Sequence, residues 1–281
     1  MNVAPLAFAL AMLPALAVAE DRWMEIPPAP AMPDATESGL VPVNGIEMYH
    51  AVYGEDQGTP ILMIHGGLGH GDLWAAQVAD LMQDHRVIVA DTRGHGRSTN
   101  DGSAYSYDLL AADYLALLDH LGIDEVHLVG WSDGANIGYA LSTSAPERLA
   151  SHFAHAGNVT LDGIDPSVDD DEVFAAYVGT MAEDYAAMSP TPEGFDEFLG
   201  GIVEMWSTEN PGGLASLSDV TVPTLVVQSE FDEAILTQHS EAIAARIPGA
   251  SLLVLNDVSH FAAFQDPEGY TAAIRAFIDA Q

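Results

Sequence analysis

Short, mostly apolar runs alternate along the chain with stretches in which apolar residues recur every three or four positions. The runs occupy residues 61–64, 87–90, 126–129, 153–156, 222–228 and 251–255. Such runs are typical of parallel strands that are buried on both faces. The intervening spacing predicts helices, most clearly at 107–121, where Gly122 ends the pattern. The alternation therefore predicts an α/β fold with a mostly parallel central sheet flanked by helices.

Two segments depart from this alternation. Residues 20–40 are rich in proline, which is typical of an extended surface arm or linker. Residues 157–219 carry acidic, Met and aromatic residues at helical spacing, interrupted by prolines, and are predicted to form a helical cap. The core domain is then expected at 41–156 and 220–281. Within the cap, the acidic run 169–172 stands where it would stabilise a helix N-terminus.

Nine large side chains of the predicted cap are candidates to line a site beneath it. They are Phe174, Tyr177, Met181, Tyr185, Met188, Phe195, Phe198, Met205 and Trp206. Packing of the cap onto the core explains each of them individually. Among them, Met181 and Trp206 are the candidate substrate contacts.

The first nineteen residues have the pattern of a signal peptide. An apolar run from Leu6 is broken by Pro14 and ends in Ala17-Val18-Ala19, which fits an A-x-A cleavage site before Glu20. The run is too short to span a membrane comfortably. We therefore expect an exported protein, periplasmic or secreted, with no membrane association after cleavage.

The charge of the chain is strongly acidic. Asp and Glu number 42 against 7 basic residues, all of them arginine, and the formal net charge is -35. Such a surface repels nucleic acid and anionic membranes, so neither is an expected partner. The absence of cysteine excludes disulfides and thiolate chemistry. A saline habitat would account for the acidity, since salt screens the self-repulsion, and the dependence of refolding yield on salt tests that hypothesis.

The pentapeptide Gly130-Trp131-Ser132-Asp133-Gly134 lies between an expected strand and an expected helix at 135–144. A Gly-x-Ser-x-Gly sequence in that context predicts a strained turn that exposes the serine hydroxyl above the sheet. The glycines are expected because side chains at either position would crowd the turn. Ser132 is therefore the candidate nucleophile, against the alternative of a chance match.

Backbone donors for an oxyanion are expected from a second loop. Residues 65–69, His-Gly-Gly-Leu-Gly, directly follow the apolar run 61–64, so their N–H groups can point into a cavity. The first donor is the N–H of Gly67 or of Leu68. The second is the N–H of Asp133, the residue after the nucleophile. His65 itself is expected to be structural.

A base and its orienting acid follow two later strands. Asp232 comes after the run 222–228, and His260 comes after the run 251–255. Carboxyl ends of parallel strands share one edge of a sheet, so both side chains are expected near Ser132. Glu230 and Glu233 are nearby substitutes for Asp232.

These motifs, with Asp91-x-Arg93-Gly94-His95-Gly96-x-Ser98, make residues 41–280 resemble the α/β-hydrolase superfamily of serine esterase type. The 91–98 loop is expected to be structural. The resemblance implies that Ser132 attacks a carbonyl, that His260 acts as general base and then acid, and that Asp232 orients His260. It implies no metal and no cofactor.

The elbow sequence also resembles that of valacyclovir hydrolase-like amino-acid-ester esterases. In those enzymes the residue that matches Asp133 holds the α-ammonium group of the substrate. Trp131 is a further candidate substrate contact. The preferred prediction is a carboxylesterase that cleaves small-molecule esters through an acyl-enzyme. The alternatives are an amino-acid-ester or acyl-homoserine-lactone hydrolase, a carbon–carbon bond hydrolase, and a non-catalytic ligand-binding member.

Overall fold

The computed structural model describes residues 21–55, 57–208 and 216–281, so the predicted signal peptide at 1–19 lies outside the described residues. In these ranges eight strands form one sheet in the order β1-β2-β4-β3-β5-β6-β7-β8. The strands are β1 Glu37–Val43, β2 Ile46–Tyr53, β3 Ile61–Ile64, β4 Val87–Ala90, β5 Val126–Trp131, β6 Leu149–His155, β7 Thr224–Ser229 and β8 Ser251–Leu255. Pairing from β4 to β8 is parallel, whereas β1 and β2 are antiparallel additions at one edge. The predicted mostly parallel sheet is thus confirmed.

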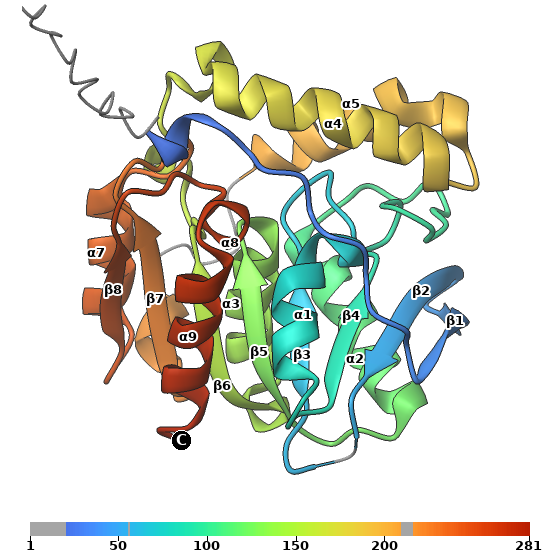
Figure 1. Ribbon diagram of the computed structural model, residues 1–281, viewed down its shortest axis with the longest axis horizontal. Coiled ribbons are helices and arrows are strands. Elements are labelled where there is room, and N and C mark those ends of the chain that lie inside the picture. The colour runs from blue at the N-terminus through green and yellow to red at the C-terminus, as the bar shows by residue number, and fades with distance from the viewer. Residues whose placement is uncertain (1–20, 56, 209–215) are drawn as a thin grey trace, which may run out of the picture.

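Helices cover both faces of the sheet (Figure 1). They are α1 Ala75–Leu81, α2 Tyr107–Leu121, α3 Asp133–Ser144, α4 Glu172–Met188, α5 Phe195–Trp206, α7 Thr237–Arg246, α8 Ala262–Gln265 and α9 Pro267–Ile278. Helices α1 and α9 pack together on one face, and α2 and α3 pack together on the other. Helices α4 and α5 lie across the carboxyl ends of the parallel strands. No described helix is long and apolar enough to cross a bilayer.

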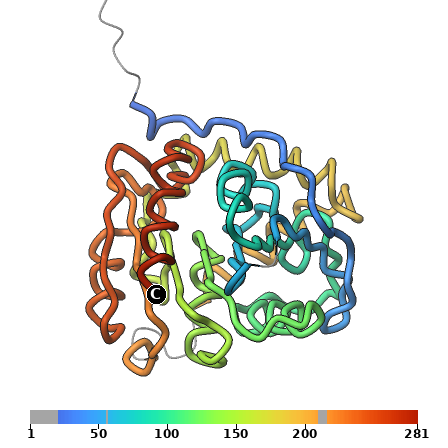
Figure 2. Tube along the Cα trace, turned by 60° about the horizontal axis from the view of Figure 1, so that its bottom comes forward, coloured from blue at the N-terminus to red at the C-terminus, as the bar shows by residue number. Residues whose placement is uncertain are grey.

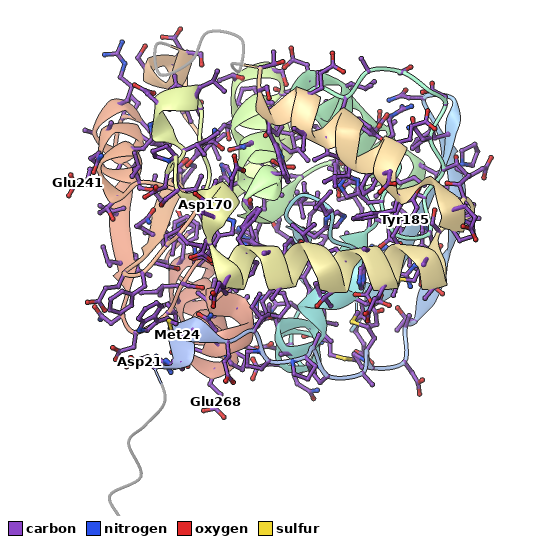
Figure 3. The ribbon with its side chains drawn as sticks, turned by 90° about the horizontal axis from the view of Figure 1, so that it is seen from above. Asp21, Met24, Asp170, Tyr185, Glu241 and Glu268 are labelled. Carbon is purple, nitrogen blue, oxygen red and sulfur yellow. The ribbon has the colours of Figure 1, made fainter. Side chains whose placement is uncertain are left out.

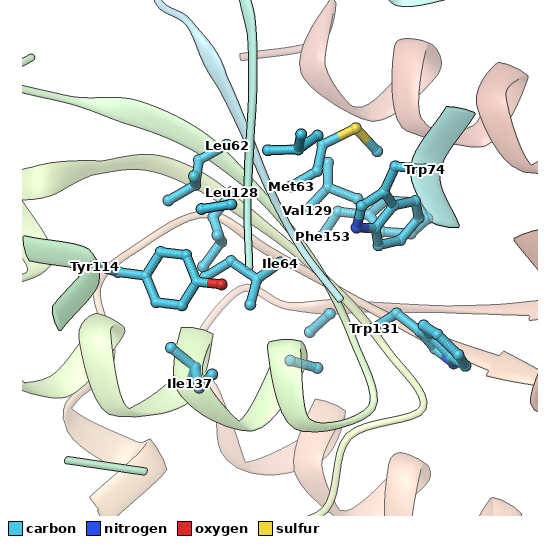
Figure 4. Packing of buried hydrophobic residues seen from close by; sticks show 14 of the residues in the cluster. Leu62, Met63, Ile64, Trp74, Tyr114, Leu128, Val129, Trp131, Ile137 and Phe153 are labelled. Carbon is cyan, nitrogen blue, oxygen red and sulfur yellow. The ribbon is translucent and has the colours of Figure 1, made fainter. Parts of the chain in front are cut away.

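The core alternates between the two faces of each central strand (Figure 4). Met63 and Val129 point to the side of Trp74, whereas Leu62 and Leu128 point to the side of Tyr114. Both faces of the strands are buried, which is why their sequences read as continuous apolar runs rather than as alternating ones.

The amino-terminal edge differs from the prediction. Strand β1 begins at Glu37, inside the range 20–40 that was expected to be an arm, and Glu37 pairs with Val52. The β1–β2 turn places Asn44 and Gly45 at positive φ, the conformation that an Asn-Gly hairpin requires. That dipeptide was a local signal for the hairpin. The remaining strand and helix predictions are matched within a few residues at each end.

The expected helical cap range contains α4 and α5. As predicted, the acidic run starts the first of these helices, because Asp171 accepts hydrogen bonds from the N–H groups of Val173 and Phe174. The two helices lie side by side above the sheet edge when viewed from above (Figure 3). The boundaries of the cap at 157 and 219 remain predictions.

A buried ion pair holds the loop after β4. The Arg93 guanidinium donates to both carboxylate oxygens of Asp113 at 2.7 and 2.8 Å, and both side chains are fully buried. Arg93 also pairs with Asp101 at 2.9 Å. The structural role that the sequence predicted for this loop is therefore confirmed.

We predict that Arg93→Ala lowers the free energy of unfolding by about 3–5 kcal/mol, because it leaves the Asp113 carboxylate buried without its cation. Equilibrium denaturation in urea measures the change. The matched control is Arg275→Ala, whose partners Asp80 and Asp84 are more than half exposed. These exposed ion pairs of Arg275 should contribute about 0–1 kcal/mol to the free energy of unfolding. Equal losses in the two variants would contradict the prediction.

Candidate active site

Ser132 lies in the sharp turn between β5 and α3. Its backbone has φ 55° and ψ -119°, a strained conformation for a residue with a side chain. A Cβ on Gly130 would collide with the carbonyl of Gly134, and one on Gly134 would collide with the carbonyl of Ile64. Both glycines are thus required by close backbone contacts, as the sequence predicted.

Asp232 and His260 meet beside this turn. The Nδ1 atom of His260 lies 2.9 Å from Oδ1 of Asp232, and both side chains are buried. The same carboxylate oxygen accepts the N–H groups of Ala234 at 3.0 Å and Ile235 at 2.8 Å. These bonds fix the acid, which in turn fixes the histidine ring so that Nε2 is the nitrogen left for a reaction.

The two alternative acids have other partners. Glu230 accepts the backbone N–H of Asp257 at 3.0 Å. Glu233 accepts the backbone N–H of His260 at 3.0 Å rather than its ring. The structure therefore brings Asp232, and neither glutamate, to the imidazole. The catalytic role of this pair stays a prediction.

The surroundings of Asp232 and His260 shift the pKa values of these two groups in opposite directions. Burial disfavours the charge on Asp232, but hydrogen bonds and the nearby His260 outweigh it and lower the pKa of the carboxyl. Burial also disfavours the charged form of His260, which tends to lower its pKa. The Asp232 carboxylate outweighs this, with Glu233 and Asp133 adding to it, so the pKa of His260 is raised above its ordinary value.

The loop after β3 lies directly against Ser132, the candidate nucleophile. A Cβ on Gly66 would come within 3.1 Å of the Cβ of Ser132. Leu68 has a φ of 64°, so the backbone reverses at this point. Among the described residues, the N–H groups of Gly67, Leu68 and Asp133 have no protein acceptor. An oxyanion hole requires free backbone donors of this kind near the nucleophile.

The described residues give Ser132 Oγ no hydrogen bond to His260. Bonds between a nucleophile and its base are often long without substrate and shorten in the complex. Ser132 is partly exposed, whereas Trp131 and Asp133 on either side of it are buried.

The side chain of Asp133 is already held by two neutral donors. Oδ1 accepts the Tyr107 hydroxyl at 2.7 Å, and the indole N–H of Trp206 lies 3.0 Å from Oδ1 and 2.8 Å from Oδ2. Burial raises the pKa of Asp133, although the two donors oppose this. The predicted anchor for an ammonium group therefore also joins α2, α3 and the cap helix α5.

A second contact joins the cap to the oxyanion loop. The Tyr177 hydroxyl of α4 donates to the carbonyl oxygen of Gly67 at 2.8 Å. A Cβ on Gly67 would lie 2.5 Å from both Oδ2 of Asp133 and Cζ2 of Trp206. Both loops that supply candidate oxyanion donors are thus bonded to the cap.

The chain is similar to known proteins in sequence and in fold. The sequence profile of the alpha/beta hydrolase fold matches residues 59–197. The chain is 30% identical over 260 residues to "Putative carbamate hydrolase RutD" of Pseudomonas syringae pv. syringae, covering 83% of this chain and 98% of that protein. The chain belongs to the α/β-hydrolase fold family. The fold and the serine-esterase resemblance predicted from the sequence are confirmed.

Other relatives of this α/β hydrolase carry out related chemistry. The chain is 29% identical over 278 residues to rhodomycin D methylesterase DnrP of Streptomyces peucetius, covering 79% of this chain and 92% of that one. The structure of Est816, described as an N-acyl homoserine lactone degrading enzyme, matches with a TM-score of 0.68 and 28% identity. That match covers 85% of this chain and 100% of Est816. Hydrolase activity is what these relatives have in common.

Trp131 and Met181, predicted as substrate contacts, are both buried in the hydrolase. The indole N–H of Trp131 donates to the carbonyl oxygen of His260 at 2.8 Å, so Trp131 fixes the histidine backbone. Met181 lines a cavity that lies between α4 and the N-terminal arm. The substrate contacts of both residues stay predictions.

The remaining polar residues of the motifs are structural. His65 lies 2.7 Å from the carbonyl oxygen of Gly66 through Nδ1 and accepts the N–H of Thr92 at 3.0 Å through Nε2. Burial lowers its pKa to about 4, so it stays neutral. Asp91 accepts the N–H of Gly71 at 2.8 Å. Both observations agree with the sequence prediction for these loops.

Tyr107 is the site residue that the sequence analysis missed. The sequence predicts only that Tyr107 is the first residue of a helix, yet its hydroxyl donates a hydrogen bond to Asp133. A tyrosine at a helix start carries no pattern that indicates such a contact.

Within the described ranges, no cluster of three or more His, Asp or Glu side chains is arranged to hold a metal ion.

We predict that Glu233→Gln moves the acid limb of the kcat/KM profile to lower pH. The general base must be neutral, so activity falls as pH drops through the pKa of His260. Glu233 helps to raise that pKa, and its own pKa is raised to about 7, mainly by burial, so its charge acts near and above neutral pH. The amide oxygen of Gln can still accept the His260 N–H.

Profiles of kcat/KM against pH for wild type and variant measure the shift. Glu230→Gln is the matched control, because Glu230 accepts an N–H of the same loop but is not among the main groups that raise the pKa of His260. A shift of the acid limb to higher pH in Glu233→Gln, or an equal shift in Glu230→Gln, would contradict the role of Glu233 in raising the pKa of His260.

Proposed function

We propose that this α/β hydrolase cleaves carboxylic esters of small molecules through an acyl-enzyme. The observation that carries the proposal is the buried hydrogen bond of 2.9 Å between His260 and Asp232, on the loops next to the strained turn at Ser132. A nucleophile, a base and an acid that orients the base are the parts that covalent acyl transfer needs. The free N–H groups beside Ser132 support it further.

The reaction proceeds in two halves. Ser132 Oγ bonds to the ester carbon while its proton passes to Nε2 of His260, and the carbonyl oxygen becomes an oxyanion held by the N–H groups of Gly67 or Leu68 and of Asp133. Collapse breaks the ester bond, and the leaving alcohol takes the proton from His260. A water molecule then gives a proton to His260 and attacks the acyl carbon. The bond from that carbon to Ser132 Oγ breaks as Oγ takes the proton back from His260, which releases the carboxylic acid and restores Ser132.

The contacts of Asp133 favour an ester without an α-amino group. Its carboxylate already accepts hydrogen bonds from Tyr107 and Trp206, which are neutral, so no cation is needed to satisfy it. A lactone is the second candidate, because a cyclic ester undergoes the same attack and the Est816 relative degrades N-acyl homoserine lactones.

Covalent labelling tests the nucleophile. We expect a fluorophosphonate to label wild type at Ser132, and Ser132→Ala or His260→Ala to lose nearly all ester turnover while remaining folded. Mass spectrometry locates the label and circular dichroism checks the fold. A folded wild type that does not label would instead indicate a non-catalytic ligand-binding protein.

Two matched esters that differ only in an α-amino group test the substrate class. We expect wild type to hydrolyse the plain ester at least as well as the amino ester. Asp133→Asn should change both rates by a similar factor. A preference for the amino ester that disappears in Asp133→Asn would make Asp133 a substrate anchor and favour an amino-acid-ester hydrolase. Turnover of lactones alone would favour the second candidate.

We also propose that the protein is exported. The support is the apolar run and the Ala17-Val18-Ala19 pattern at residues outside the described ranges. Mass spectrometry of the protein from its native host should find an N-terminus at Glu20. An N-terminus at Met1 would contradict this.

A further inference from the structure

The start of the N-terminal arm lies against the two loops that carry Asp232 and His260. Its first described element is a short 3-10 helix, Arg22–Met24. Figure 3 shows Met24 beside the C-terminal elements, and the arm then runs along α4 (Figure 2). The sequence predicted an extended surface segment here.

Arg22 is bonded to the loop before His260. Its Nε donates to the carbonyl oxygen of Asp257 at 3.0 Å, and Nη2 donates to that of Asn256 at 3.3 Å. The same guanidinium lies 3.3 Å from the carboxylate of Asp266. One planar side chain therefore bridges the end of β8 and the start of α9, on either side of His260.

Trp23 covers the loop that carries the acid. Its ring stacks on that of Phe231, the residue before Asp232, with centroids 4.7 Å apart and planes at 21°. The backbone N–H of Phe231 donates to the carbonyl oxygen of Val258 at 3.0 Å, two residues before His260. The stack thus lies where the acid loop and the histidine loop are joined.

Gln265 connects the arm to the histidine loop from inside. Its Nε2 lies within hydrogen-bond distance of the carbonyl oxygens of Trp23 at 3.2 Å and Glu25 at 3.0 Å, and of Ser259 Oγ at 3.0 Å. Its Oε1 accepts the backbone N–H of Ser259 at 2.7 Å. This buried amide therefore links the arm backbone to the residue that precedes His260.

Beyond Glu25 the arm is less closely packed. A cavity of about 450 Å³ separates it from α4 and α8, with Ile26, Met32, Leu73, Met181 and Phe264 among its lining residues. The polar and stacking contacts of the arm start are therefore concentrated on the two loops rather than on the cap.

We propose that Arg22, Trp23 and Gln265 are positioning residues that hold the Asp232 and His260 loops in register with Ser132. This inference rests on the proposed function. A base must be held within about 0.5 Å of its productive position, and loops need outside support to achieve this. The predicted cleavage before Glu20 would leave all three residues in the mature chain.

The rate constant for fluorophosphonate labelling of the full chain tests this without knowledge of the substrate. We expect Trp23→Ala, Arg22→Ala and Gln265→Glu to slow labelling by about tenfold to a hundredfold, as for a displacement of about 1 Å at a reacting group. Gln265→Glu can still accept the Ser259 N–H but cannot donate to the arm at neutral pH. Trp23→Phe keeps a ring for the stack and should recover most of the rate.

The matched control is Met24→Ala, because Met24 lies in the same turn but is 50% exposed. It should label at the wild-type rate. Ester turnover, where measurable, should lose kcat with little change in KM. Wild-type labelling rates in the three variants would overturn the proposal, as would losses that match the unfolded fraction measured at the same temperature. Failure of wild type to label would instead contradict the proposed function.

Discussion

The strained turn at Ser132 is the constraint on which the site depends. A left-handed backbone at a serine costs about 1–3 kcal/mol, so neighbouring structure must hold it. Strand β5 delivers the chain to the turn, α3 begins at the next residue, and Gly134 packs against the carbonyl of Ile64 at the end of β3. Because β3 and β5 are neighbours in the sheet, the loop after β3 lies against Ser132. One turn therefore fixes both the candidate nucleophile and the candidate oxyanion donors near it.

The charge of the site follows from the composition of the chain. With 42 acidic and 7 basic residues, carboxylates are placed around His260 without a lysine to balance them. Neutral donors hold Asp133, and backbone N–H groups hold Asp232, so the carboxylates stay ordered without cations. Their combined field raises the pKa of His260. Arg93, the fully buried arginine, is paired instead with Asp113.

Contacts between distant segments complete the site. Tyr177 of the cap bonds Gly67 in the loop after β3, over a separation of 110 residues. Trp206 of the cap bonds Asp133, next to Ser132, over a separation of 73 residues. Gln265 bonds the backbone of Trp23 over a separation of 242 residues. The cap and the arm thus act on different parts of the same centre. The cap contacts Gly67 and Asp133, which carry candidate oxyanion donors. The arm contacts the loops that carry Asp232 and His260.

The sequence alone determined the α/β layout, the turn at Ser132 and the loops that carry Asp232 and His260. These depend on apolar periodicity, on glycines at tight turns and on position after a strand, all of which are local. Tertiary structure alone decided that Asp232 rather than Glu233 meets the imidazole, that Tyr107 and Trp206 occupy the Asp133 carboxylate, and that the arm contacts the loops of Asp232 and His260. The physical reason is that each of these contacts joins side chains on different elements. Their distances depend on loop conformation and sheet order, which no local pattern encodes.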